Sequence, residues 1–211
     1  MGRAPSFCGV ILAAGTSTRM GRDKALLPWP PNSAQPGDTF LSAAIRSLAS
    51  ETEMVFVVAG GNSPQIAPAI YAQGATLVKN PNPEHGQFSS LRLGLQAVLS
   101  HGRDAAVVTL VDRPPVRQAT LRQLLLAFGT ALDARKWALV PEFQGKHGHP
   151  IVVAREMIEV FLRAPAESNA REVEHAHQEF IEYIAIEDPW VALNVDTPED
   201  YAALSASALP A

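Results

Sequence analysis

Residues 7–21 read FCGVILAAGTSTRMG, an apolar run that breaks into a loop of small and polar residues. Phe7–Ala14 is rich in Val, Ile and Leu and ends at Gly15, which is typical of a buried β-strand. In open α/β sheets, ligands bind at the edge where such strands end. The stretch therefore predicts a parallel sheet with a binding loop at that edge.

Apolar and amphipathic segments alternate along the chain beyond this loop. Further strands are expected at Met54–Ala59, Ala75–Val78 and Ala105–Val111. Helices are expected at Asp38–Ala49, Ser63–Gln73, Ser89–Ser100 and Arg117–Leu132. This alternation indicates parallel strands with helices on both faces of the sheet.

The pattern changes after Pro141. Residues 144–149, QGKHGH, predict a turn between strands Trp137–Phe143 and Pro150–Ala154, hence an antiparallel hairpin. The remaining expected elements are a helix at Asn169–Glu179, short strands at Phe180–Ile186 and Ala192–Val195, and a last helix capped by Thr197. We expect a Rossmann-like three-layer α/β fold with a mostly parallel sheet, helices on both faces and an antiparallel hairpin addition, in a single domain over residues 1–211.

Composition limits the function classes. Of the 211 residues, 47% are hydrophobic and 18% are charged, which excludes a disordered polymer. The formal net charge is -4 and no Lys/Arg run stands out, so nucleic acid is not an expected partner. No stretch is long enough to span a bilayer, and Cys8 alone forms no internal disulfide, so we expect a cytoplasmic protein with no membrane partner.

The loop after the first strand has the chemistry of a phosphate site. Small residues at 13–15 let the backbone come close to a nucleotide, and the N–H groups of Thr16–Thr18 can cradle phosphate oxygens. Arg19 and Lys24 add positive charge where a triphosphate would lie. The Walker loop and the dinucleotide fingerprint are both missing. The alternative is a Gly-rich turn with a solvated Arg and Lys.

The same loop resembles a known signature. Leu-Ala-Ala-Gly-x-Ser-x-Arg-Met-Gly-x-x-Lys, from Leu12 to Lys24, is similar to the pattern of the nucleotidyltransferases that include molybdenum cofactor cytidylyl- and guanylyltransferases, methylerythritol cytidylyltransferase and sugar-1-phosphate nucleotidyltransferases. Later motifs resemble the molybdenum cofactor cytidylyltransferases in order: NPNPEHG at 80–86 with Ser89-Ser90, VDRP at 111–114, GHP at 148–150, Arg171, and NVDTPEDY at 194–201.

The resemblance implies transfer of CMP from CTP to the molybdenum-molybdopterin cofactor, with Mg²⁺ required and pyrophosphate released, and a molybdoenzyme client as a possible further partner. It assigns catalysis to Arg19, Lys24 and Asp112, and Mg²⁺ to Asp112 and Asp196. The residues it assigns to nucleotide or acceptor binding are Leu12, Ala13, Ala14, Gly15, Asn80, Gly86, Ser90, His149 and Arg171.

Several alternatives stay open. Asp112 can be a turn former, Asp196 can favour a helix N-terminus, and Asn80 can order an Asn-Pro turn. CTP is favoured because Ala14 stands where the guanylyl enzymes tend to have Gly. A guanylyltransferase, another NTP transferase and a non-catalytic cofactor carrier or chaperone are the competing functions. Arg113 and Asn194 depart from the family pattern and could alter acceptor handling.

Overall fold

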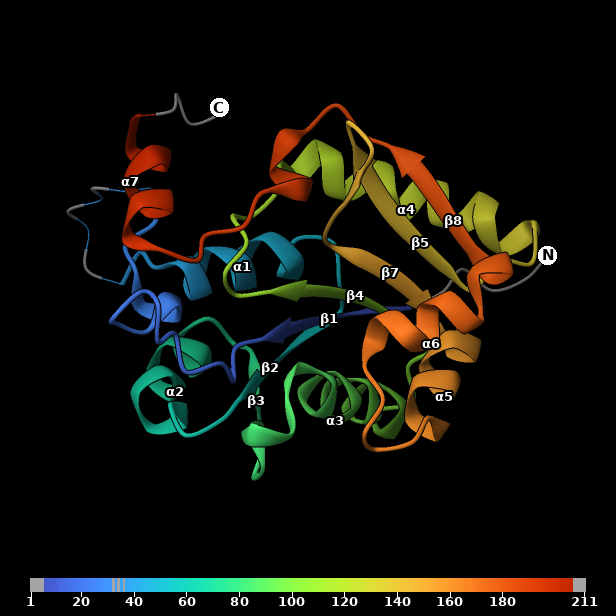
Figure 1. Ribbon diagram of the computed structural model, residues 1–211, viewed down its shortest axis with the longest axis horizontal. Coiled ribbons are helices and arrows are strands. Elements are labelled where there is room, and N and C mark those ends of the chain that lie inside the picture. The colour runs from blue at the N-terminus through green and yellow to red at the C-terminus, as the bar shows by residue number, and fades with distance from the viewer. Residues whose placement is uncertain (1–5, 32, 34, 36, 207–211) are drawn as a thin grey trace.

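The computed structural model describes residues 6–206 apart from 32, 34 and 36, so the ends of the expected domain, residues 1–5 and 207–211, lie outside the described residues. An eight-stranded sheet has the order β3-β2-β1-β4-β7-β5-β6, with β8 paired to β5 (Figure 1). The strands are β1 (Phe7–Leu12), β2 (Met54–Ala59), β3 (Thr76–Lys79), β4 (Ala105–Leu110), β5 (Ala138–Phe143), β6 (Lys146–His147), β7 (Ile151–Ala154) and β8 (Ile181–Ala185).

Most strands run in one direction, as the sequence predicts. β1 is parallel to β2 and β4, β2 is parallel to β3, and β5 is parallel to β8. The expected antiparallel pair is formed by β5 and β7, and β7 also lies antiparallel to β4, inside the sheet. The predicted turn between them contains a further short strand, β6, which pairs with β5. All four residues of β7 are buried, and a strand that is apolar throughout is most stable where both of its faces are covered.

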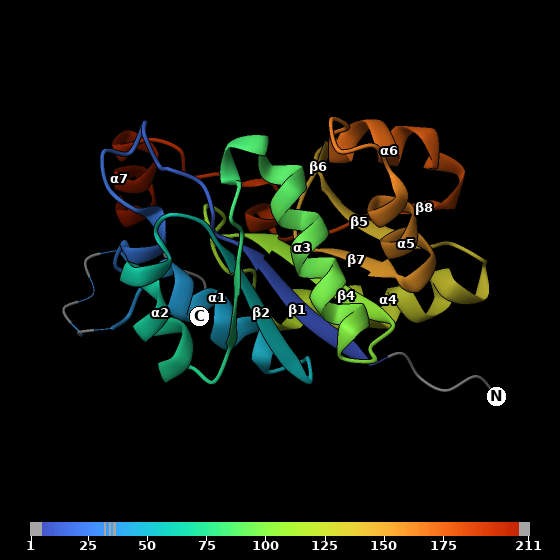
Figure 2. The same ribbon diagram turned by 90° about the horizontal axis from the view of Figure 1, so that it is seen from below.

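Helices cover both faces of the sheet. On one face lie α1 (Phe40–Ala49), α2 (Ser63–Ala72) and α4 (Gln118–Asp133). Figure 2 shows the other face, with α3 (Gln87–Ser100), α5 (Arg155–Arg163) and α6 (Ala170–Ala176) in front of the strands. The last helix, α7 (Pro198–Ala206), lies beside the ends to which β1 and β4 point (Figure 1). Within the described residues, no helix is both long and apolar enough to cross a membrane.

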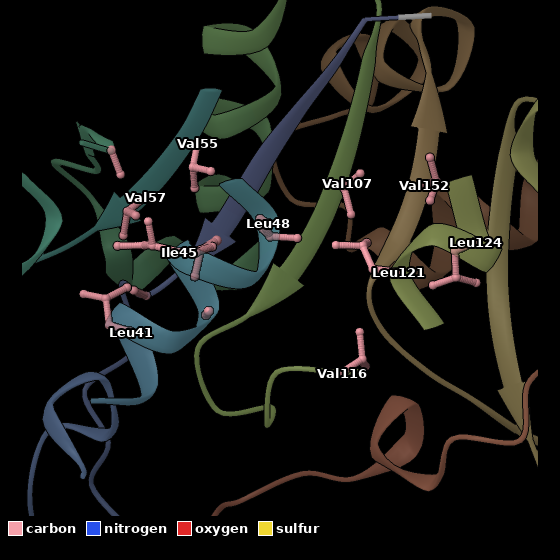
Figure 3. Close-up of a cluster of buried hydrophobic side chains, with 14 of the residues drawn as sticks. Leu41, Ile45, Leu48, Val55, Val57, Val107, Val116, Leu121, Leu124 and Val152 are labelled. Carbon is pink, nitrogen blue, oxygen red and sulfur yellow. The ribbon is translucent and has the colours of Figure 1, made fainter. Parts of the chain in front are cut away.

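Two hydrophobic cores result because strand side chains alternate between faces. β2 contributes Val55 and Val57 to the core beneath α1 and α4, and it contributes Phe56 and Val58 to the core beneath α3 and α5. Figure 3 shows the first of these cores, in which side chains of α1 and α4 meet those of β2, β4 and β7. Both cores position the strand ends at which the candidate site lies.

A third, smaller core lies at one end of the sheet. It is formed by buried side chains of the loop after β1, the segment after it, α1, and the chain around α7: Met20, Leu27, Trp29, Phe40, Ala43, Val195 and Leu204. Trp29 packs edge-on against Phe40 and Trp190, with ring centroids 4.8 Å and 5.3 Å away. The Tyr201 hydroxyl donates a 2.8 Å hydrogen bond to the Pro28 carbonyl. This third core therefore fastens α7 to the loop after β1.

Three local expectations need correction. Ala192–Val195 is no strand, because Pro189–Ala192 forms a 3₁₀ turn capped by Asp188. α5 was not expected, although Met157, Ile158 and Phe161 form its buried stripe. α3 begins at Gln87 rather than Ser89, because Gly86 is its N-cap. Thr197 does cap α7, since its hydroxyl accepts from the Asp200 N–H at 3.2 Å.

Candidate active site

The site lies where the sheet changes its winding direction. From β1 the chain continues to β2 on one side, and it returns through α3 to β4 on the other side of β1. Crevices at such points, beyond the carboxyl ends of the strands, are the usual ligand sites of open α/β sheets. Leu12 and Leu110 are paired in register at these ends, and the Val111 N–H donates to the Leu12 carbonyl at 3.0 Å. The loop after β1 and Asp112 therefore face one crevice.

The loop after β1 is held by its own contacts. The Ala13 N–H continues the sheet to the Val58 carbonyl at 2.8 Å, and Met20 is buried in the third core. The Ser17 hydroxyl accepts from the Lys24 N–H at 3.2 Å. Ser17 has a φ of 50°, a left-handed conformation that costs free energy and persists where surrounding contacts determine it.

Four predicted residues meet in one charged cluster. Lys24 Nζ lies 2.6 Å from Asp196 Oδ1 and 3.5 Å from Asp112 Oδ2, and Arg19 Nη2 lies 3.0 Å from Asp196 Oδ1. The hydrogen bond from Lys24 lowers the pKa of Asp196. The Lys24 side chain is 10% exposed and that of Arg19 is 69% exposed, so Lys24 is the buried cation of the cluster and Arg19 the exposed one.

A cavity of about 250 Å³ opens over this cluster. Its wall includes residues of the loop after β1, of α3 and of the chain after β4, among them Leu12, Gly15–Arg19, Lys24, Gln87, Asp112 and Asp196. The cavity is thus lined by the loop after β1 and by the carboxylates of Asp112 and Asp196. This arrangement can bind a polyphosphate together with a cation.

The carboxylates suit a hard divalent cation. Asp112 Oδ1 is buried and has no hydrogen-bond partner in the described part of the chain. A free carboxylate oxygen in a polar cleft is a natural ligand for Mg²⁺, which takes one or two carboxylates and completes its shell with phosphates and waters. No cluster of three or more His, Cys, Asp or Glu side chains occurs among the described residues, so a metal here depends on the substrate for further ligands.

A second cavity, of about 520 Å³, adjoins the first. The two share Leu12, Gly15, Thr16 and Gln87, and the second adds Ala14, Pro83, Glu84, Gly86 and Ser90. Gly86 has φ 85° and ψ 177°, a conformation open essentially to Gly alone, so it is required to begin α3 at the cavity wall. The two cavities therefore form one cleft, with a charged compartment and a less polar compartment.

Asn80 supports this second cavity from behind. It is buried and lines neither cavity, and its Nδ2 donates to the hydroxyls of Ser89 and Ser90 at 2.9 Å each. Its Oδ1 accepts from the Asn82 N–H at 2.9 Å. Ser89 lies in the first turn of α3 and does not cap it. Ser90 lines the cavity, and its hydroxyl can still donate one hydrogen bond.

Three further residues of the predicted set line neither cavity. Ala13 is buried, and Arg171 is exposed on α6. The His149 N–H donates to the Val191 carbonyl at 2.8 Å, while its Nδ1 is buried without a partner in the described chain. Burial, reinforced by the charge of Arg113, lowers the pKa of His149 to about 3. The imidazole is therefore neutral at physiological pH.

The low pKa of His149 predicts acid sensitivity. An unfolded His takes up a proton near pH 6.5, but folded His149 does so only near pH 3, so the free energy of unfolding should fall as the pH drops through this window. At pH 4.5 the loss should be on the order of 2 kcal/mol relative to pH 7. Urea unfolding of the wild type and His149→Gln at both pH values measures it, with exposed His175→Gln as the control. An equal pH dependence in all three proteins would refute the assignment.

The two departures from the family pattern both lie beside Asp196. Asn194 Nδ2 donates to Asp196 Oδ2 at 2.6 Å, which an Asp at that position could not do. Arg113 Nη1 donates to the carbonyls of Val191 and Leu193, at 3.4 Å and 3.3 Å, and the Val195 N–H donates to the Asp112 carbonyl at 2.9 Å. Burial lowers the pKa of Arg113. These contacts hold the Asp196 segment against the end of β4.

Sequence reasoning missed several residues of the cleft. Gln87 lines both cavities and Glu84 lines the second. Asn62 and Asp23 contact each other at the base of the loop after β1. Asn62 follows Gly60-Gly61 at the carboxyl end of β2, and that position at the ligand-binding edge was the available signal.

Known proteins are similar to this chain over most of its length. The model of a family described as the MobA-like NTP transferase domain matches residues 9–180. The Escherichia coli K12 molybdenum cofactor cytidylyltransferase is 25% identical over 91% of this chain and 92% of its own length. The Xanthomonas euvesicatoria molybdenum cofactor guanylyltransferase is 28% identical over 94% of each. A nicotine blue oxidoreductase of Paenarthrobacter nicotinovorans is 31% identical over 71% of each.

Solved structures show the same architecture. The crystal structure of Rv0371c from Mycobacterium tuberculosis H37Rv is 29% identical, with a TM-score of 0.79 over 97% of this chain and 100% of that one. A structure of the same protein in complex with manganese is 25% identical, with a TM-score of 0.72 over 96% of this chain and 100% of that one. The matches thus extend across nearly the whole chain.

Proposed function

The chain belongs to the family of the MobA-like NTP transferase domain and is a nucleotidyltransferase, and from this premise we propose that it transfers CMP from CTP to a molybdenum-molybdopterin acceptor in the presence of Mg²⁺. The observation that carries the proposal is the shared cleft: Lys24 and two carboxylates lie beneath one cavity, and the Ala14–Ser90 compartment opens directly beside it. A nucleoside triphosphate needs both compartments.

The reaction is a phosphoryl transfer at the α-phosphate. An acceptor phosphate oxygen attacks the α-phosphorus, the bond to the β-phosphate oxygen breaks, and pyrophosphate leaves. Such a transfer depends on positioning and on neutralising charge, and it needs no protein nucleophile. Backbone N–H groups of the loop after β1 orient the phosphates, and Arg19 and Lys24 offset negative charge on the α-phosphate and on the leaving group.

Asp112 and Asp196 are the residues that would hold the metal, and Mg²⁺ bound there would withdraw charge from the phosphate oxygens. The Mycobacterium tuberculosis relative has been solved in complex with manganese, which supports the proposal of a divalent ion. We assign Arg113 and Asn194 the task of keeping the Asp196 carboxylate in place through the contacts described above.

The second cavity, which we call the base compartment, is the basis for the proposal that the nucleotide is CTP. Ala14 lines this compartment at a position where the guanylyl enzymes tend to have Gly, so its methyl group leaves less room for a purine. The Ser90 hydroxyl can donate to a cytosine oxygen or ring nitrogen, and the Glu84 carboxylate can accept from the exocyclic amine. Asn80 contributes by fixing Ser90.

We predict that kcat/KM favours CTP over GTP by roughly ten- to a hundredfold, because a mismatch of one buried hydrogen bond is worth about 1–3 kcal/mol. The measurement is a competition assay with equal CTP and GTP, a molybdopterin acceptor and Mg²⁺, in which the two dinucleotide products are separated. Ala14→Gly should shift the ratio toward GTP, whereas Ala134→Gly, at the exposed end of α4, should not. Equal products from the wild type would overturn the cytidylyl proposal.

The same assay separates the enzyme from a carrier that only binds the finished cofactor. A carrier releases no pyrophosphate from labelled CTP, whatever the acceptor concentration. Stoichiometric release of pyrophosphate and formation of the dinucleotide is the expected result. Pyrophosphate release with a sugar phosphate, but not with molybdopterin, would mean that the protein is a nucleotidyltransferase with a different acceptor.

A further inference from the structure

Asn62 holds together the two ends of the catalytic loop, residues 13–23. It occupies the N-cap position of α2, but its side chain makes no capping hydrogen bond to that helix. Instead, Asn62 Nδ2 donates to the Ala13 carbonyl at 2.9 Å and to Asp23 Oδ2 at 2.8 Å. Its Oδ1 accepts from the Gly60 N–H at 3.1 Å. One amide thus joins the start of the catalytic loop to its end and to β2.

The surroundings leave this amide little freedom. A Cβ on Gly60 would lie 3.0 Å from the Ala14 carbonyl oxygen and 3.1 Å from Pro83 Cβ, so the end of β2 packs closely against both the catalytic loop and the base compartment. Since the Ala13 carbonyl and the Asp23 carboxylate can only accept, and the Gly60 N–H can only donate, the position needs two donors and one acceptor. Only an amide side chain supplies that set.

The hydrogen bond from Asn62 to Asp23 links Asn62 to Lys24. The second oxygen of Asp23 accepts from the Ala25 N–H at 2.9 Å and caps the 3₁₀ turn Lys24–Leu26. That turn starts with the residue whose ammonium lies between Asp112 and Asp196. The geometry points to Asn62 as a positioning residue for nucleotidyl transfer, acting through Asp23 on Lys24. This inference rests on the proposed role of Lys24 in the transfer.

Asn62→Asp tests the inference with almost no change in shape. The carboxylate loses both donors and places a negative charge against Asp23. We expect kcat to fall between about ten- and a hundredfold, the scale of a misplaced catalytic group, while KM for CTP changes less than threefold. Gln118→Glu is the matched control, because it also places a carboxylate against the carboxylate partner of an amide, Glu51, on an exposed surface. Its kcat should be that of the wild type.

Two double variants distinguish positioning from a general structural role. In Asp23→Asn with Asn62→Asp, the new amide can donate to the new carboxylate, so part of the lost kcat should return. In a Lys24→Ala background, Asn62→Asp should lower kcat little further, because the group it positions is gone. If Asn62→Asp does not fold, Asn62→Ala removes both donors without adding a charge and carries the same expectations.

The outcomes separate this inference from the proposed function. Wild-type turnover in Lys24→Ala would refute the role of Lys24 and the inference with it. A large loss in Lys24→Ala, combined with an unchanged kcat in Asn62→Asp, would overturn the inference alone. An equal loss from Asn62→Asp with and without Lys24 would likewise overturn it, because Asn62 would then act on the fold and not through Lys24.

Discussion

Asp112→Asn is expected to lower turnover by about a thousandfold, since metal-assisted charge stabilisation contributes several kcal/mol and each 1.36 kcal/mol is tenfold in rate. The amide keeps the shape of the side chain but is a poor ligand for Mg²⁺. Asp112 Oδ1, buried and without a partner in the described chain, is the oxygen whose character changes. Steady-state pyrophosphate release at increasing Mg²⁺ measures the effect.

The control for this variant is Asp133→Asn, which makes the same change at the exposed end of α4. Circular dichroism and thermal melting should show that both variants keep the fold. Turnover of Asp112→Asn close to that of the wild type at saturating Mg²⁺ would remove Asp112 from the metal site and leave it as a turn residue after β4.

Lys24→Ala is expected to lower kcat by about a hundredfold with a smaller change in nucleotide affinity, the usual cost of losing one preorganised group that stabilises developing charge. The ammonium is buried at 2.6 Å from Asp196 Oδ1 and 3.5 Å from Asp112 Oδ2, so it is already fixed in the cleft before substrate arrives. Initial rates over a range of CTP concentrations give kcat and KM separately.

Removal of Lys24 also leaves two carboxylates facing each other without their common cation. The melting temperature of Lys24→Ala should therefore rise more on addition of Mg²⁺ than that of the wild type. Lys136→Ala, which removes a Lys paired with Glu182 on β8, serves as the control. A variant in which only KM for CTP increases would make Lys24 a binding residue.

Local sequence patterns were sufficient for most of the fold. The strand predicted at Met54–Ala59 is observed with the same bounds, because a continuous apolar run closed by two glycines has few other structures available. The patterns failed where distant contacts decide. Three of the four residues of Ala192–Val195 are apolar, yet the segment pairs with no strand in the described chain. Its Leu193 carbonyl accepts from Arg113 instead, and its Val195 N–H donates to the Asp112 carbonyl.

In the candidate site, too, local patterns predict some residues and distant contacts decide others. Residues that the motifs name, such as Lys24, Asp112 and Asp196, do meet in the cleft. Lys24 and Asp112 follow the ends of the neighbouring strands β1 and β4, and the hydrogen bond from the Val195 N–H to the Asp112 carbonyl brings Asp196 to the same place. Asn62 belongs to no motif, and the role that we propose for it depends on three hydrogen-bond partners: one directly after β1, one directly after β2 and one directly before Lys24. A periodicity cannot reveal such a contact, since it exists only once those elements are packed.

The third core has a consequence for how the enzyme is made. Protein synthesis delivers the N-terminal part of a chain first. The ribosome therefore releases the catalytic loop and Lys24 long before Asp196, Val195 and Leu204, which complete the cluster and the third core. A nascent chain can fold its sheet around β1 and β4 while Lys24 still has no Asp196 to contact. On the roles proposed for Asp112 and Asp196, the active site is complete only when the segment carrying α7 packs onto the rest of the domain.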